Sequence, residues 1–373
     1  MSPTITDEDV TELRTVLLDF LERLSGPGRV REVMETDTGI DAPLWRRMAD
    51  ELGLPGLAVP ETNGGAGYDF SIQLAVFEEL GRSLACVPYL STVGLAIPAL
   101  LASGDTAVQA DVLPALVAGT ATATVAFTEQ DFDQALPDHC LIARGLSDAQ
   151  TAALTGHKSF VLDGGTADFI LVLAGGDAGA CLYLVEGTAP GLVRTAMRTL
   201  DPTRRMATLD FRDTPARLVS NHDPGKALEE ALNFANSAIA AEQLGGAQRC
   251  LDMAVEYAKL REQFGRPVGS FQAIKHRCAD MLVAVESSRS AVDHLGRTFA
   301  EQPDDVPVAT ALAKAFCSDA YLYVAAENIH IHGGMGFTWE HDAHLYFRRA
   351  QSTALLHGDS SHHRRVLADR LGF

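Results

Sequence analysis

The stretch Arg261–Gln272, which reads REQFGRPVGSFQ, joins two long helical patterns through a glycine-containing turn. Arg261, Gln263 and Gln272 offer hydrogen-bond donors for a phosphate or an amide edge. Phe264 offers a flat apolar face. A dinucleotide presents a pyrophosphate, polar ring edges and an aromatic ring system, so this set of side chains is typical of a segment that binds one.

A second glycine-rich segment, His330–Phe337, reads HIHGGMGF. Three glycines in four residues allow backbone N–H groups to approach a ligand closely. His330 and His332 have no partners at the spacing of zinc ligands, so we expect no metal site. They are also compatible with ordinary packing histidines.

Amphipathic helical patterns surround both segments and predict a helical bundle. One helix carries an inward stripe of Leu244, Ala247, Leu251, Ala254 and Ala258. The next carries Phe271, Ile274, Cys278, Met281, Leu282 and Val285. A third, over Val308–Ile331, points Ala311, Leu312, Ala315 and Phe316 inward.

The rest of the chain shows two kinds of sequence pattern, one helical and one β-type. Helical periodicity predicts helices near Val10–Leu21, Asp41–Leu52, Ser71–Gly81 and Val108–Ala118, the last of which Pro114 should kink or split. Short β-type runs follow at Ala121–Phe127, Asp168–Ala174, Ala180–Val185 and Met206–Phe211. No GxGxxG follows a strand, which excludes a Rossmann domain. We therefore expect an α+β fold, mainly α, with a helical domain over residues 1–119, a β domain over 120–219 and a helical domain over 220–373.

Composition limits the classes of function. The chain has 373 residues, 47% of them hydrophobic, and a formal net charge of −19. Such an acidic chain does not suit binding to nucleic acid or to an anionic membrane. The six cysteines are scattered, which is typical of free thiols. Val93–Ala102 is too short an apolar stretch to span a bilayer, and the N-terminus does not resemble a signal peptide, so we expect a cytoplasmic protein.

Six motifs in order resemble the acyl-CoA dehydrogenase family over essentially the whole chain. They are Pro60-Glu61 with the glycines that follow, Phe127-Thr128-Glu129, Gly156-His157-Lys158, Gly245-Gly246-Ala247-Gln248-Arg249, the Arg261–Gln272 stretch and Gly333-Gly334-Met335-Gly336-Phe337. The resemblance implies an N-terminal helical domain, a central β-barrel-like domain and a C-terminal four-helix bundle. It also implies FAD bound at a subunit interface of a homo- or heterotetramer.

The resemblance assigns roles to individual residues. Contacts to the adenine and pyrophosphate half of an FAD held mainly by the neighbouring subunit are implied for Arg261, Gln263, Phe264, Gln272, Gly333 and Gly334. His330 stands where glutamine is common in the family, which weakens one such contact. Near the flavin ring the resemblance places Thr128, Phe160 and Leu162. It also implies that the loop with Gly358 and Asp359 touches the cofactor near the end of the bundle. Phe160 is equally compatible with plain sheet core.

The glutamate that removes the substrate's α-proton is missing from both places where the family keeps it. The position before the glycine of the C-terminal loop holds His357, and the position on the helix before the Arg261 segment holds Ala235. Glu242 lies two turns beyond Ala235, a shift of about 10.5 Å along a helix. Glu242 is one candidate base, although it also suits a buried hydrogen-bonding carboxylate. His357 is another, because imidazole titrates near neutral pH. The third explanation is a partner chain that carries the glutamate.

The function implied is the FAD-dependent α,β-dehydrogenation of an acyl-CoA thioester, of fatty-acid or steroid side-chain type, with electrons passed to an electron-transferring flavoprotein. One alternative is a non-catalytic subunit of a heterotetrameric acyl-CoA dehydrogenase. Another is a flavin monooxygenase on the same fold, which needs no α-carbon base. The bulky acidic segment Gln130–Ala135 replaces the glycine- and serine-rich loop that usually contacts CoA.

Overall fold

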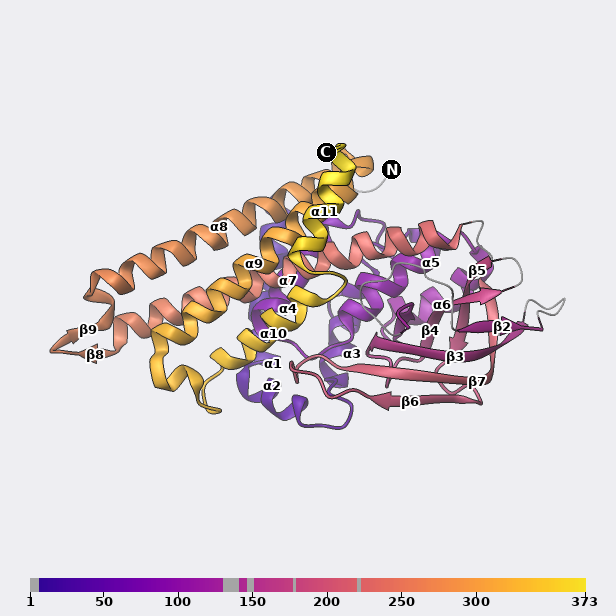
Figure 1. The fold of residues 1–373 in the computed structure, drawn as a ribbon, viewed down its shortest axis with the longest axis horizontal. Helices are drawn as coiled ribbons and strands as arrows, with labels where there is room; N and C mark the ends of the chain where they lie inside the picture. Colours follow the sequence, from indigo (N-terminus) through magenta and orange to yellow (C-terminus); the bar gives the residue numbers. More distant parts are fainter. Residues whose placement is uncertain (1–6, 130–140, 146–150, 177–178, 220–222) are drawn as a thin grey trace. The chain divides into compact units, whose positions relative to one another are not determined.

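The computed structural model describes residues 7–129, 141–145, 151–176, 179–219 and 223–373 (Figure 1). Their contacts form two compact units. The first comprises Val33–Tyr68 and Cys86–Ala235, and the second comprises the described chain before Val33 together with Asp69–Ala85 and Asn236–Phe373. Among the described residues, no helix combines the length and the apolar character needed to cross a membrane.

The first unit begins with short helices. They are α3 (Ala42–Asp50), the 3₁₀ turns η1 (Leu54–Gly56) and η2 (Glu61–Asn63), the π-helix η3 (Leu90–Ala96), α5 (Ile97–Ser103) and α6 (Thr106–Val117). The Asp41 carboxylate accepts a hydrogen bond from the Leu44 N–H at 3.1 Å and caps α3. Helix α6 runs through Pro114, so the helix is not split there.

The described residues of the first unit also form seven strands, which are followed by the beginning of α7 (Pro224–Leu260). They are β1 (Ala123–Ala126), β2 (Ile142–Arg144), β3 (Thr151–Leu162), β4 (Phe169–Gly176), β5 (Gly179–Glu186), β6 (Leu192–Ala196) and β7 (Met206–Val219). The pairing order β4-β2-β3-β7-β5 returns to β4 through the β4–β5 pair. The strands therefore close into a ring around an apolar core that includes Leu154, Ile170 and Phe211.

The second unit is helical. Its helices are α1 (Asp7–Leu24), most of α2 (Pro27–Met34), α4 (Ser71–Ser83), most of α7 (Pro224–Leu260), α8 (Gln272–Glu301), α9 (Val306–His332), α10 (Ala343–Leu355) and α11 (Ser360–Leu371). Its short elements are β8 (Glu262–Gln263), β9 (Arg266–Pro267), and the 3₁₀ turns η4 (Val268–Ser270), η5 (Pro303–Asp305) and η6 (Gly333–Phe337). Helices α8 and α9 lie side by side in Figure 1, and α9 also contacts α10 and α11.

Two glycines allow α4 and α7 to approach each other closely. A Cβ atom added at Gly81 would lie 2.1 Å from the Glu242 carbonyl oxygen. One added at Gly245 would lie 1.8 Å from the Glu78 carbonyl oxygen. Real Cβ atoms do not approach backbone oxygens so closely, so only glycine fits at these positions.

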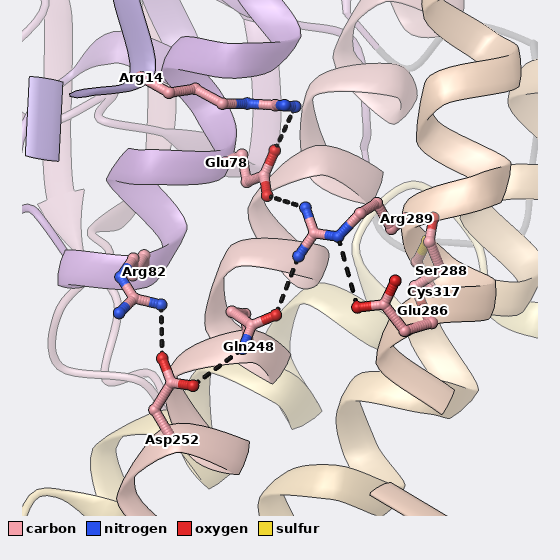
Figure 2. Close-up of polar contacts among 9 residues, drawn as sticks. All are labelled: Arg14, Glu78, Arg82, Gln248, Asp252, Glu286, Ser288, Arg289 and Cys317. Carbon is pink, nitrogen blue, oxygen red and sulfur yellow. Dashed lines mark hydrogen bonds and ion pairs between the residues drawn. The ribbon is translucent and has the colours of Figure 1, made fainter. Parts of the chain in front are cut away.

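A buried carboxylate connects three helices of the second unit (Figure 2). Glu78 on α4 is 5% exposed and accepts hydrogen bonds from Arg14 on α1 at 2.7 Å and from Arg289 on α8 at 2.8 Å. Arg289 also donates to the Gln248 side-chain oxygen on α7 at 2.9 Å. Because both partners are cations, the buried charge of Glu78 is compensated.

The structure confirms the expected fold class: it is mainly α, with helices before and after a central β region that closes like a barrel. The boundaries at residues 119 and 219 lie where the sequence changes between helical and β-type patterns. The two units, by contrast, are defined by packing contacts, so the boundaries remain a prediction. Three expected inward positions are wrong. Leu282, Leu312 and Phe316 are 48%, 39% and 41% exposed, because each lies on the outer side of its helix in this chain.

Candidate functional site

The Arg261–Gln272 stretch forms a hairpin between α7 and α8. Strands β8 and β9 pair Gln263 with Arg266, which leaves Phe264 and Gly265 as a two-residue turn. Both turn residues have positive φ, +55° and +76°, as a type I′ turn requires. The Phe264 side chain at the tip is 91% exposed. The turn geometry therefore presents an aromatic ring to solvent instead of packing it into the chain.

The other hairpin side chains predicted to bind FAD are also exposed. Arg261 and Gln263 lie at the base and along one strand, and Gln272 begins α8. The Gln263 amide donates to the Glu262 carbonyl at 2.9 Å, and the Gln272 amide lies 3.4 Å from His276 Nε2. Exposed donors at these positions are placed for contact with a ligand or another chain.

The second glycine segment forms η6 at the end of α9. Gly333 has φ +58° and ψ −135°, a conformation that is open essentially only to glycine. A Cβ atom added at Gly333 or Gly334 would meet no atom within 4 Å, so the backbone here faces open space. His330 is exposed, and its Nδ1 lies 3.1 Å from Glu327, which also accepts from Arg277 on α8 at 2.6 Å.

The end of α7 contacts the end of α9 through aromatic rings. Tyr257, in the last turn of α7 before the hairpin, lies against His332, the last residue of α9, at a centroid distance of 4.3 Å and with the ring planes tilted by 32°. His332 in turn lies against His341 at 4.3 Å. Burial lowers the pKa of His332, which favours the neutral ring in this contact. The second glycine segment thus contacts, through His332, the helix turn that leads into the hairpin.

On the barrel, Thr128 is bonded to the residue that precedes Phe160. The Ser159 N–H donates to the Thr128 carbonyl at 2.8 Å. Phe160 has φ +55°, unusual for a bulky residue, and lies where the β3–β7 register shifts. Leu162, by contrast, is only 3% exposed, which favours a core position over a cofactor contact. The neighbouring Lys158 is fully buried and donates to Glu129 at 2.9 Å.

The loop between α10 and α11 carries His357, Gly358 and Asp359. His357 and Gly358 have φ +58° and +104°. The Asp359 carboxylate accepts from the His362 N–H at 2.7 Å and caps α11. The carbonyl of Gly358 accepts a hydrogen bond from Lys314 Nζ at 3.4 Å.

The two candidate bases lie beside members of one buried hydrogen-bond network. Glu242 is 6% exposed, and the adjoining Gln243 donates to the Ser318 hydroxyl at 3.1 Å. Ser318 accepts from Lys314 at 3.1 Å, and Lys314 reaches Gly358, the neighbour of His357. The burial of Glu242 favours the interpretation as a structural carboxylate, and its catalytic role remains a prediction.

Sequence reasoning missed Lys314. The signal was present, because a single lysine interrupts the apolar run between Ala311 and Cys317 on the inward face of α9. Five cysteines, namely Cys86, Cys181, Cys250, Cys278 and Cys317, are free thiols as expected, and Cys140 lies outside the described residues. Within the described ranges, no three His, Cys, Asp or Glu side chains are grouped to hold a metal. The Gln130–Ala135 segment also lies outside the described residues.

Two family models match the chain. The acyl-CoA dehydrogenase N-terminal domain matches residues 7–120, and the acyl-CoA dehydrogenase C-terminal domain matches residues 225–372. Among curated proteins, the acyl-CoA dehydrogenase IpdE2 of Mycobacterium tuberculosis is 36% identical over 349 residues, which cover 94% of this chain and 93% of that protein.

Solved structures show the same similarity. The ChsE4-ChsE5 complex from Mycobacterium tuberculosis has a TM-score of 0.87 and 32% identity, and the match covers 100% of this chain and 99% of that chain. The butyryl-CoA dehydrogenase from Megasphaera elsdenii has a TM-score of 0.87 and 28% identity, with 100% of both chains covered.

Proposed function

Because this chain belongs to the acyl-CoA dehydrogenase family, we propose that it binds FAD and takes part in the α,β-dehydrogenation of an acyl-CoA thioester, with electrons passed to an electron-transferring flavoprotein. The observation that carries this proposal is the hairpin with its exposed ring at Phe264 and exposed donors at Arg261 and Gln263. A cofactor bound at a contact between two chains would cover this ring, and the donors beside it would meet the cofactor's polar groups.

The residues present fit a dinucleotide. Arg261 and Gln263 would hold its phosphate and polar edges, and the open backbone at Gly333 and Gly334 leaves room for close approach. On the barrel, Thr128 and Phe160 would orient the flavin end. Bound FAD would supply the hydride acceptor of the reaction.

Proton removal is the step for which this chain offers the fewest suitable side chains. Ala235 is fully buried and holds no ionisable group, and His357 stands at the second position. A general base must lie within hydrogen-bond reach of the proton it takes. His357 is the imidazole on a loop that carries predicted flavin contacts, and Glu242 is the buried carboxylate on α7.

A second candidate function is that of a subunit whose partner carries the glutamate. The absence of a carboxylate at residues 235 and 357 favours it. The ChsE4-ChsE5 complex, a relative by structure, is named for two different chains. In this assembly the present chain would hold part of the FAD and leave proton removal to its partner.

The test is to purify the chain alone and co-expressed with a homologous acyl-CoA dehydrogenase chain, and to count subunits and flavins by native mass spectrometry. Each sample is then mixed anaerobically with short, branched and steroid side-chain acyl-CoA thioesters, and bleaching of the flavin band is followed. Bleaching by the chain alone supports the dehydrogenase, and bleaching only in the mixed assembly supports the subunit role. Colourless protein that refuses added FAD contradicts both, and turnover that needs oxygen and reduced flavin identifies a monooxygenase.

A further inference from the structure

Lys314 on α9 is a fully buried lysine whose hydrogen bonds are all made inside the protein. Its side chain is 0% exposed. Its Nζ donates to the Ser318 hydroxyl at 3.1 Å, the Thr353 carbonyl at 3.0 Å and the Gly358 carbonyl at 3.4 Å. Lysine is almost never fully buried unless it is paired, so three oriented acceptors call for an explanation.

Two of the three acceptors are backbone carbonyls at one junction. Thr353 lies in the last turn of α10, where carbonyl groups lack helical partners and where a cation is favoured. Gly358 lies in the loop that follows. The ammonium group therefore joins the end of α10 to the middle of the Leu356–Asp359 loop.

The loop also has two other contacts. The Gly358 N–H donates back to the Leu355 carbonyl at 3.2 Å, and Asp359 caps α11. Between Leu355 and Gly358, His357 is a non-glycine residue in the left-handed region, a conformation that persists only where the surroundings fix it. The Lys314 bond to the Gly358 carbonyl is the contact that reaches the loop from α9.

We propose that Lys314 is a positioning residue for the Leu356–Asp359 loop: its ammonium fixes the Gly358 carbonyl, and through it the direction of His357 and the placement of Asp359. The relevance to catalysis rests on the proposed function, because this loop carries a candidate base and two predicted flavin contacts. The positioning itself does not depend on a flavin.

The protonation state of Lys314 gives the arrangement a pH dependence. An ammonium group has three N–H donors, which match three acceptors, whereas the neutral amine has two. Burial lowers the pKa of Lys314 to about 7, while Cys317 and Asp319 on α9 and Asp359 in the loop raise it. On α11, His363 faces the same charge, and burial followed by the charge of Lys314 lowers its pKa to about 3. Loss of one donor should release the longest bond, the one to Gly358.

The test is hydrogen–deuterium exchange of the purified full chain, followed in the peptide that contains the Gly358 amide. In Lys314→Met, protection of that amide should fall about tenfold or more, well beyond any fall shared by the α9 amides, even though the loss of a donor to three buried acceptors also lowers the melting temperature. Lys226→Met, at an exposed lysine paired only loosely with Glu230 at 3.9 Å, is the control and should change neither. Unchanged loop protection in Lys314→Met overturns the proposal, as does a loss of protection that merely parallels a lower melting temperature.

A wild-type series keeps the test open if Lys314→Met does not fold. From about pH 6 to about pH 8.5, protection of the Gly358 amide, corrected for the intrinsic exchange rate, should fall while that of the α9 amides stays constant. Protection that does not change over this range overturns the proposal. Flavin content is measured separately, so a colourless protein would contradict the proposed function without deciding the role of Lys314.

Discussion

At Phe264, a single substitution can test cofactor binding without disturbing folding. Its ring is 91% exposed, so Phe264→Ala removes almost no packing from the isolated chain. We expect the free energy of unfolding to change by less than about 1 kcal/mol. If the ring covers a cofactor between chains, flavin retention on gel filtration should drop sharply. A variant that keeps its full flavin content would contradict the role given to the hairpin.

Glu79 predicts a pH dependence of stability. It is 9% exposed, and burial, together with the charge of Glu78, raises its pKa from 4.5 to about 7. The folded protein thus binds this proton more tightly than the unfolded chain does. The stability it contributes is complete below pH 4.5 and is lost as the pH rises to about 7, a loss on the order of 3 kcal/mol.

Glu79→Gln should remove this pH dependence. The free energy of unfolding of the variant should therefore rise relative to that of the wild type between pH 4.5 and about 7. Urea unfolding at a series of pH values measures the difference. Glu22→Gln, at an exposed residue of α1, is the matched control and should follow the wild type. Parallel pH curves for Glu79→Gln and the wild type would show that Glu79 titrates normally in the folded protein.

The predicted binding residues could be found from the sequence because their motifs are contiguous. The residues of the hairpin follow one another closely in the sequence, and so do those of η6. The residue types alone therefore indicate what each segment can bind. Lys314 could not be assigned this way, because its acceptors come from α10 and from a loop about forty residues away in the chain. The exposure of Leu282 and Phe316 could not be predicted from the sequence either. A stripe of apolar residues on a helix does not indicate whether the same chain or another chain covers it.

Among elements, the crossing of α4 and α7 depends on glycine. Gly245→Ala places a methyl group 1.8 Å from a backbone oxygen that cannot move without moving α4. We expect a loss of roughly 2 kcal/mol or more, measured by urea unfolding. Gly28→Ala in α2, where an added Cβ meets nothing within 4 Å, is the matched control and should gain up to about 1 kcal/mol. Equal effects of the two substitutions would contradict the close approach.

The strands show where the pattern of apolar residues in the sequence fails to predict secondary structure. The four predicted β runs correspond to β1, β4, β5 and β7, because their apolar residues are nearly continuous. Strand β3 escaped prediction although it has twelve residues, because Gly156 and charged or polar side chains interrupt its apolar pattern. Those interruptions include Lys158, which is buried in an ion pair with Glu129, and the strand's register shifts on either side of it.

For the whole molecule, the exposed apolar residues of α8 and α9 predict an oligomer. Leu282, Val283, Leu312 and Phe316 are all exposed. Exposed apolar side chains on two helices that contact each other are typical of a subunit interface. Phe316→Glu should shift native mass spectra toward smaller assemblies, while the free energy of unfolding of the single chain changes by less than about 1 kcal/mol. Val16→Glu, at an exposed apolar residue on α1, is the control, and an assembly that tolerates Phe316→Glu equally well would place the interface elsewhere.

The two-residue turn at Phe264 and Gly265 also sets a rule for how this chain can evolve. Side chains alternate between the faces of a strand, so one residue inserted at the tip would exchange the faces of everything on one arm. Gln263 and Arg266 would no longer lie opposite each other. A change of length in this segment would therefore disturb every contact of one arm at once, whereas a single substitution on an arm changes one side chain. Descendants of this chain that keep its ligand should keep the spacing from Arg261 to Gln272 fixed.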